Sequence, residues 1–140
     1  MLSIVVGPVV GPRREAVVVL LLDSVGGGEP GARRAAAGCL LGEGVVLTAL
    51  WAGEPVAAAC VVVAGQAGRL TALAVGAPWR GRGIGRSVVE AAVIRLGLAS
   101  LEAETDRDAV GFYAACGFTV VSLGERYSGV ERFAVSRGSQ

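Results

Sequence analysis

Apolar side chains recur along the chain with two different periods, and these predict where helices and strands lie. Valine and leucine residues within 13–25 and 85–96 fall at helical spacing, which predicts two amphipathic helices. Shorter apolar runs bounded by glycine and other turn residues predict strands. The predicted strands span 2–10, 45–51, 55–64, 69–75, 99–105, 118–123 and 130–135, and two further short helices span 33–41 and the segment after 105 through 116.

This succession gives the element order β-α-α-β-β-β-α-β-α-β-β. It is typical of an α/β (α+β) fold in which helices cover both faces of a mixed, mostly antiparallel sheet of about seven strands. The 140 residues are the length of a single domain, which we expect to span 1–140. Two local contacts are also predicted: a capping box at Thr105–Asp108 that starts the last helix, and an ion pair between Arg86 and Glu90 one helical turn apart.

A glycine-rich turn, Arg80–Gly85, stands between the predicted strand 69–75 and the helix that follows. Its three glycines let the backbone turn tightly and approach a ligand with no Cβ in the way. Amide groups at the start of a helix, at the positive end of its dipole, form a site for anions. Arg82 and Arg86 add positive charge, so the turn predicts a bound phosphate or pyrophosphate.

A second segment, Gly26–Gly31, also satisfies the pattern G-x-G-x-x-G and follows the apolar run 16–22. As a strand, loop and helix, it would predict a dinucleotide-binding unit. The run before it has helical periodicity, the strands after it form hairpins, and the chain is short for a dinucleotide domain with a substrate domain. These observations favour a loop near the site over a dinucleotide-binding protein.

Composition removes several classes of function. The net charge is +1 and no basic stretch predicts nucleic-acid binding. The apolar runs are too short to span a membrane, and no signal peptide is expected. The chain has no histidine, which excludes imidazole as a base or metal ligand. Cys39, Cys60 and Cys116 are widely spaced, so we expect three buried thiols in a cytoplasmic protein without disulfides or a metal.

The element order and three motifs together resemble the GNAT superfamily of acyl-CoA N-acyltransferases, the GNAT family N-acetyltransferases. The strong part of the resemblance covers 69–118, and the glycine turn combined with an F-Y-x-x-x-G-F motif is far more specific than either alone. The segments that carry it are Leu73–Val75 with Pro78–Arg86, then Leu101–Asp106, then Gly111–Phe118, and more weakly the hairpin Trp51–Val56.

The resemblance implies acetyl-CoA as co-substrate and assigns residues to it. The strand residues Leu73, Ala74 and Val75 would splay from the next strand and pair with the pantetheine like an added strand. The Val75 amide would bind the thioester carbonyl oxygen as negative charge develops there. Tyr113 would border the cofactor and protonate the leaving CoA thiolate. The pyrophosphate would be bound by Arg80, Gly81, Arg82, Gly83, Ile84, Gly85 and Arg86.

The general base stays open between several groups. Glu102 and Glu104 are two residues apart on one strand, so both side chains lie on the same face. The resemblance favours Glu102, because relatives that acetylate protein N-termini carry a catalytic glutamate near that position, although the spacing to Tyr113 is slightly shorter here. A solvated strand face with two surface carboxylates, a water relayed by backbone carbonyls, or the more remote Glu43 are the alternatives.

The expected function is therefore transfer of an acetyl group from acetyl-CoA to a primary amine by direct attack in a ternary complex. A non-catalytic acyl-CoA sensor is the alternative, with a dinucleotide-binding protein behind it. The acceptor stays open among small amines, amino acids, aminoglycosides, polyamines and protein N-termini. The family often dimerises through its last strands, so a homodimer is a further expectation, whereas nucleic acid, membrane and metal are not expected as partners.

Overall fold

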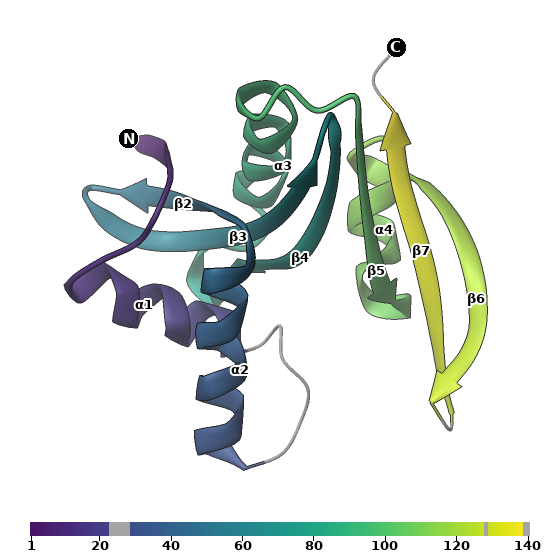
Figure 1. The fold of residues 1–140 in the computed structure, drawn as a ribbon, viewed down its shortest axis with the longest axis horizontal. Helices are drawn as coiled ribbons and strands as arrows, with labels where there is room; N and C mark the ends of the chain where they lie inside the picture. Colours follow the sequence, from purple (N-terminus) through teal and green to yellow (C-terminus); the bar gives the residue numbers. More distant parts are fainter. Residues whose placement is uncertain (23–28, 128, 139–140) are drawn as a thin grey trace.

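Seven strands form one sheet in the order β1-β2-β3-β4-β5-β7-β6. The structure, a computed structural model, describes residues 1–22, 29–127 and 129–138. All neighbouring strands run antiparallel except β4 and β5, which are parallel (Figure 1). The strands are β1 (Leu2–Val6), β2 (Val45–Trp51), β3 (Glu54–Ala64), β4 (Ala67–Val75), β5 (Ser100–Asp106), β6 (Thr119–Tyr127) and β7 (Val130–Gly138). The predicted fold class is confirmed.

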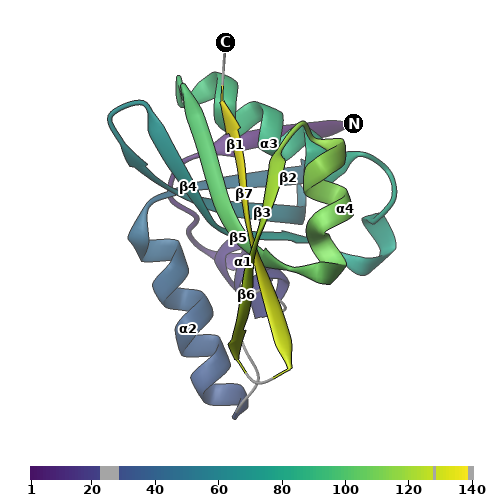
Figure 2. The same cartoon turned by 90° about the vertical axis from the view of Figure 1, so that its right-hand side faces the viewer.

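Helices lie on both faces of this sheet, as predicted. One core joins α1 and α2 to side chains such as Ala58 and Ala72, and the other joins α3 and α4 to alternate positions such as Ala57 and Ala59. Figure 2 shows α2 and α4 on opposite sides. The helices are α1 (Pro12–Leu21), α2 (Pro30–Glu43), α3 (Ile84–Arg95) and α4 (Arg107–Ala115), with a 3-10 turn at Ala77–Trp79. Within the described residues, none of these helices has the length and apolarity to cross a membrane.

Backbone conformation moves several predicted boundaries. The first strand ends at Val6 instead of residue 10, because Gly7 has a φ of 135° and Pro8 cannot donate to the sheet. Helix α2 begins three residues early because the Glu29 carboxylate accepts hydrogen bonds from the Gly31 and Ala32 amides, at 3.0 and 3.2 Å. It continues through the glycine at which it was predicted to end.

The segment 26–31 does not follow a strand. The apolar run before it belongs to α1, and Pro30 already starts α2, while residues 26–28 lie outside the described residues. The dinucleotide-binding pattern of strand, loop and helix is therefore not formed.

The two predicted local contacts around α3 and α4 are wrong. Asp106, not Thr105, caps α4, and its side chain makes no capping hydrogen bond, because β5 extends through Asp106. Glu90 forms its ion pair with Arg137 of β7, and this hydrogen bond is the main cause that lowers the pKa of the Glu90 carboxyl below its usual value. The charge of Arg86 adds only a smaller lowering of the same pKa. A contact across the fold thus replaces one within the helix.

The centre of the sheet opens where β4 and β5 separate. These strands pair only over three residues each, Ala67–Arg69 of β4 and Ser100–Glu102 of β5. Gly68 allows them to approach there, because a Cβ at this position would lie 2.7 Å from a Leu98 methyl group. Thr71 is an extra residue in β4, which shifts the register against β3, and its hydroxyl donates to the Cys60 carbonyl at 3.2 Å. Past this bulge β4 no longer pairs with β5, as predicted for its last residues.

Candidate active site

The glycine-rich turn and the start of α3 form one wall of a pocket of about 270 Å³. Gly83, with a φ of 80°, caps α3, and the first helical hydrogen bond runs from the Ser87 amide to the Gly83 carbonyl at 3.1 Å. The amides of the helix's first turn therefore have no acceptor within the helix and form an anion site. The lining residues are Val75, Trp79, Arg80, Gly81, Gly83, Ile84, Gly85, Arg86, Phe112, Ala115 and Cys116.

Gly85 allows α3 to pack closely against its neighbours. A Cβ at this position would lie 3.0 Å from the Phe112 ring and 3.4 Å from a Val75 methyl group. The missing side chain therefore lets α4 and the end of β4 pack directly on the first turn of α3, which brings Val75 and Phe112 beside the glycine-rich turn as walls of the pocket.

Three side chains hold the turn in place. The Arg82 guanidinium lies over the Trp79 ring, 5.4 Å from its centroid, and Trp79 in turn packs on Trp51 with 5.5 Å between ring centroids. The Arg80 Nε donates to the Val75 carbonyl at 2.9 Å. The turn is thus tied both to the β2–β3 hairpin and to the end of β4.

The edge of β4 that faces the gap carries the backbone groups of Leu73 and Val75. The Gly76 amide donates to Val56 of β3 at 2.8 Å, and backbone groups of a strand alternate in direction. Ala74 therefore faces β3 as Gly76 does, whereas Leu73 and Val75 face the other way. Of the three predicted cofactor-binding residues in β4, two are oriented toward the gap.

A second pocket, of about 240 Å³, lies in the gap itself and contains Tyr113. Its walls come from β4, β5, α4 and β7. Tyr113 is only 7% exposed, with its ring edge-on to Phe112 and Phe118 at 5.1 and 5.2 Å. Burial, with a smaller contribution from Cys116, raises the pKa of Tyr113 to about 12. Its hydroxyl therefore holds its proton at neutral pH and can donate it.

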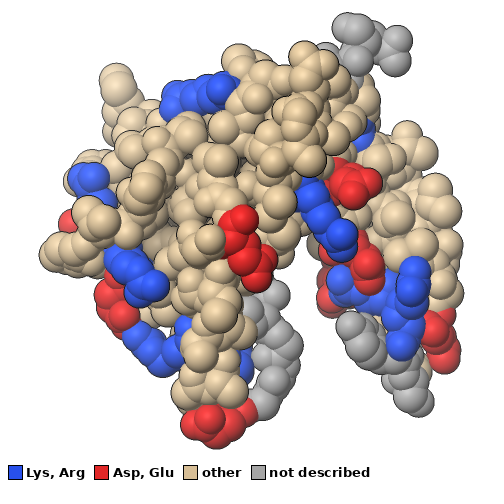
Figure 3. Space-filling view, viewed as in Figure 1, with Lys and Arg blue, Asp and Glu red and all other residues tan. Residues whose placement is uncertain are grey.

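The structure separates the two candidate glutamates. Glu104 lines the pocket of Tyr113 and accepts a hydrogen bond from the Arg132 Nε at 3.3 Å. Glu102 lines the neighbouring pocket, of about 230 Å³, beside Arg69, and Glu104 borders both pockets. Figure 3 shows this side of the molecule hollowed, with acidic and basic side chains along its walls.

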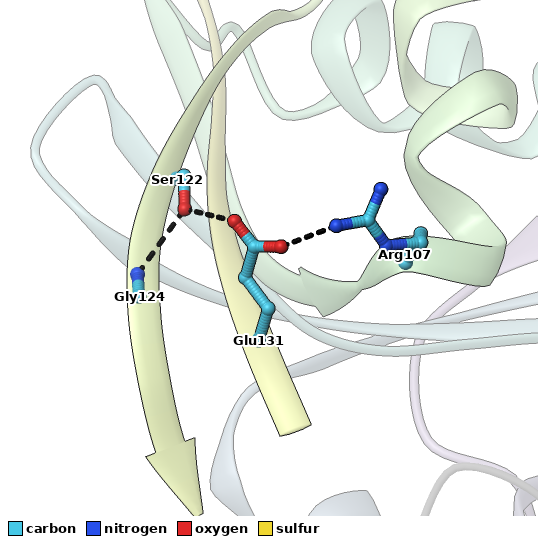
Figure 4. A network of polar contacts seen from close by, with 4 residues as sticks. All are labelled: Arg107, Ser122, Gly124 and Glu131. Atoms are coloured by element: carbon cyan, nitrogen blue, oxygen red, sulfur yellow. Dashed lines mark hydrogen bonds and ion pairs between the residues drawn. The ribbon is translucent and has the colours of Figure 1, made fainter. Parts of the chain in front are cut away.

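Arg132 is a site residue that sequence reasoning missed. It belongs to none of the motifs identified in the sequence, and the pairing of β7 with β5 brings it to the pocket of Tyr113. The neighbouring residue Glu131 accepts hydrogen bonds from Ser122 and Arg107, which lowers the pKa of its carboxyl (Figure 4). This network ties β6 and β7 to the start of α4 and so holds Arg132 in register.

The cysteines divide into two groups. Cys60 and Cys116 are buried, and burial is the main cause that raises the pKa of both thiols, of Cys60 to about 11. Cys39 on α2 is exposed, which corrects the expectation of three buried thiols. Cys116 borders the pocket of the glycine-rich turn, where its raised pKa keeps it an uncharged thiol.

Comparisons with known proteins relate this chain to a family and to a fold. A family model described as an acetyltransferase (GNAT) domain matches residues 42–120, more than half of the chain. No curated protein sequence matches this chain. The solved structures described next are all less than 25% identical to this chain, so their likeness shows that the fold is shared and does not show a shared activity.

Three solved structures illustrate that likeness. A structure described as a GNAT-family acetyltransferase from Desulfovibrio desulfuricans has 21% identity and a TM-score of 0.78, with 99% of each chain covered. A GNAT acetyltransferase from Elizabethkingia anophelis with acetyl-CoA bound has 13% identity and a TM-score of 0.73, covering 99% of this chain and 98% of that one. The ribosomal-protein-S18-alanine N-acetyltransferase from Escherichia coli has 17% identity and a TM-score of 0.71, covering 99% and 94%.

Proposed function

The chain belongs to the GNAT acetyltransferase family, and we propose that it transfers an acetyl group from acetyl-CoA to a primary amine by direct attack of the amine on the thioester. The observation that carries this proposal is the alignment of the two pockets. Val75 and Phe112 border the pocket of the glycine-rich turn, whereas Leu73 and Tyr113 border the pocket in the gap. The same strand edge and the same helix therefore lead from the anion site to the proton donor.

The residues fit acetyl-CoA along this path. The α3 amides with Arg82 and Arg86 bind the pyrophosphate. The outward edge of β4 pairs with the pantetheine, as a strand edge pairs with an extended peptide. The amides of Leu73 and Val75 both face this path, and Leu73 shares the pocket of Tyr113. We therefore assign stabilisation of the developing oxyanion to the Leu73 amide and binding of the pantetheine to Val75. The sequence-based assignment gave the oxyanion to Val75, which is the next residue on the same edge of β4.

Proton transfer is assigned to two side chains of the second pocket. Tyr113 donates its hydroxyl proton to the departing thiolate, and its buried position keeps that proton available. Glu104 accepts the proton of the attacking amine, because it shares the pocket of Tyr113 and Glu102 does not line it. No covalent enzyme intermediate is required.

Similar structures support this substrate pair. The Elizabethkingia protein holds acetyl-CoA, and the Escherichia coli enzyme is named for acetylation of an alanine of ribosomal protein S18. The co-substrate and an amine acceptor are thus both represented among proteins with this fold.

The first test is calorimetric titration of the protein with acetyl-CoA, with NAD as the control ligand. We expect saturable one-site binding to acetyl-CoA and none to NAD. Arg86→Met should weaken acetyl-CoA about 10-fold through loss of a charge-assisted contact. Arg95→Met, at the opposite end of α3, is the matched control and should bind normally. Absence of acetyl-CoA binding would overturn the proposal.

The second test separates an enzyme from a sensor. Release of CoA is measured against a panel of amines, and Tyr113→Phe should lower kcat about 100-fold or more while leaving acetyl-CoA binding unchanged. Equal turnover by wild type and Tyr113→Phe would remove Tyr113 from the chemistry. Binding without turnover for every amine would identify an acyl-CoA sensor instead.

A further inference from the structure

Two arginines of β7 have nearly the same exposure and very different surroundings. The side chain of Arg137 is 23% exposed and that of Arg132 is 24% exposed. Arg137 makes three hydrogen bonds: its two terminal nitrogens donate to the Glu90 carboxylate, and one of them also donates to the Cys116 carbonyl at 3.2 Å. It is a structural arginine that fastens β7 to α3 and α4.

Arg132 makes far less use of its donors. Its one side-chain hydrogen bond within the described residues is the 3.3 Å contact from Nε to Glu104, so both terminal nitrogens, Nη1 and Nη2, are without a partner there. Nη1 and Nη2 are not among the buried polar atoms that lack a partner, so solvent reaches them and they can donate to a ligand. Because Nε is held by Glu104, the open side of the group is the Nη1–Nη2 end.

Arg132 borders the reaction pocket. It lines the same pocket as Tyr113, together with Glu104 and Asp106. Asp106 caps α4 by position only, and its side chain makes no capping hydrogen bond, so its carboxylate is not consumed by the helix. The pocket therefore holds a cationic fork and two carboxylates around one proton donor.

We propose that the acceptor is a small molecule that carries a free carboxylate beside the reacting amine, as an α-amino acid does, and that Arg132 binds this carboxylate through Nη1 and Nη2. The inference rests on the proposed acetyltransfer and names its acceptor class. The planar fork of a guanidinium matches the two oxygens of a carboxylate. The amino group attacks as the neutral amine, and Glu104 accepts its proton as the amide bond forms, while Tyr113 protonates the departing thiolate.

The test compares acceptors that differ only at the carboxylate. Release of CoA is measured for common L-amino acids, for their carboxamides and for the amines that lack the carboxyl group, for example phenylalanine, phenylalaninamide and phenethylamine. We expect kcat/KM to favour the free acid about 10-fold or more, because a charge-assisted contact is lost in the other two. The carboxamide also mimics a peptide N-terminus, so a preference for it would overturn the proposal in favour of a protein acceptor.

Variants then identify the residue responsible. Arg132→Met should lower kcat/KM for the preferred acid about 10-fold or more, to the value of the matched amine without a carboxylate, and leave that amine unaffected because it makes no contact with the fork. Arg132→Lys should restore part of the loss. Arg69→Met, which removes a positive charge from the neighbouring pocket, is the control and should keep the preference. An equal loss for all acceptors in Arg132→Met would assign Arg132 to the support of Glu104 and overturn the inference.

Failure of this inference is distinct from failure of the proposed function. Turnover of amines without preference for the acid, with normal acetyl-CoA binding, overturns only the acceptor class. Absence of turnover with every acceptor overturns both. Calorimetric titration of the preferred acid into the protein saturated with CoA gives a readout independent of turnover, and Arg132→Met should abolish that binding.

Discussion

The two halves of the sheet, on either side of the β4–β5 junction, are built from different side chains. In the β1–β4 half the central strands are aliphatic on both faces: Leu47, Ala57, Ala58 and Ala59 are fully buried. Helices α1 and α2 cover one face and α3 the other. In the other half β5 strictly alternates between buried and exposed positions, and α4 packs on β5, β6 and β7.

The two halves therefore differ in role: the first contributes mainly to the stability of the fold, and the second provides the side chains that can contact a ligand. Side chains enclosed on both faces can only pack, so the first half supplies a rigid β4 and the anion site at its end. Three charged residues of β5 and β7, namely Glu104, Asp106 and Arg132, line the gap and are not needed to fill the core. The candidate active site lies where the two halves part, with backbone groups from one wall and ionisable side chains from the other.

Adjacent residues of β5 give the largest expected contrast. Leu101 is fully buried at the junction, so Leu101→Ala should lower the free energy of unfolding by about 2–5 kcal/mol through lost burial and a cavity. Glu102 points to the exposed face, and Glu102→Ala should change it by less than about 0.5 kcal/mol. Urea denaturation of both variants measures the contrast. Equal destabilisation would show that the exposed face of β5 also carries the fold.

Tyr113 provides the next largest effect, as a function of pH. Its pKa is about 12 in the folded protein, against about 10 in an unfolded chain. The folded state thus holds the proton more tightly, so this contribution is full below pH 10 and is lost as the pH rises toward 12. The loss is about 2–3 kcal/mol.

Comparison with Tyr113→Phe isolates that effect, because Cys60 titrates over a similar range in both proteins. Denaturation midpoints are measured between neutral pH and the alkaline limit. The wild type should lose more stability than the variant as the pH rises. Parallel curves would mean that the Tyr113 hydroxyl is solvated and titrates normally.

The elements of the β1–β4 half could be predicted from the sequence because the spacing of apolar residues within each strand or helix is a local property of that element. The strand at Val45–Trp51 has the predicted bounds, and the element order and the opening of β4 are confirmed. Predicted element boundaries were wrong where a side-chain cap or the conformation of a glycine determines the boundary. Glu29 starts α2 early, and Gly7 ends β1 early.

The charged half was less readable because its contacts join residues far apart in the sequence. Arg137 reaches Glu90 across 47 positions and Arg132 reaches Glu104 across 28. The second pair depends on the register of β5 against β7 and the first on the packing of α3 beside β7. Tertiary packing sets both, and no local pattern encodes them. The family motifs pointed to the glycine turn and Tyr113, but they contain no signal for Arg132.

Arg137 should contribute to the fold in spite of its charge. Arg137→Met leaves Glu90 and the Cys116 carbonyl without their donor, and we expect a loss of about 1–2 kcal/mol, between the values for exposed and buried pairs. Glu90 has a lowered pKa in the folded state, so its contribution is present above its ordinary pKa and fades as the pH falls. The difference between wild type and variant should therefore shrink in acid, and a difference independent of pH would contradict the pairing.

Substitution of Arg132 should have the smallest effect on stability, and it provides a direct comparison with Arg137 on the same strand. Its side chain is as buried as that of Arg137, but its single long contact to Glu104 resembles an exposed ion pair. Arg132→Met should change the free energy of unfolding by less than about 0.5 kcal/mol, measured by the same denaturation. A loss as large as that of Arg137→Met would make Arg132 a structural residue. If Arg132→Met leaves the stability unchanged but alters the acceptor preference, two arginines of equal burial on one strand have different roles: Arg137 stabilises the fold and Arg132 binds the acceptor.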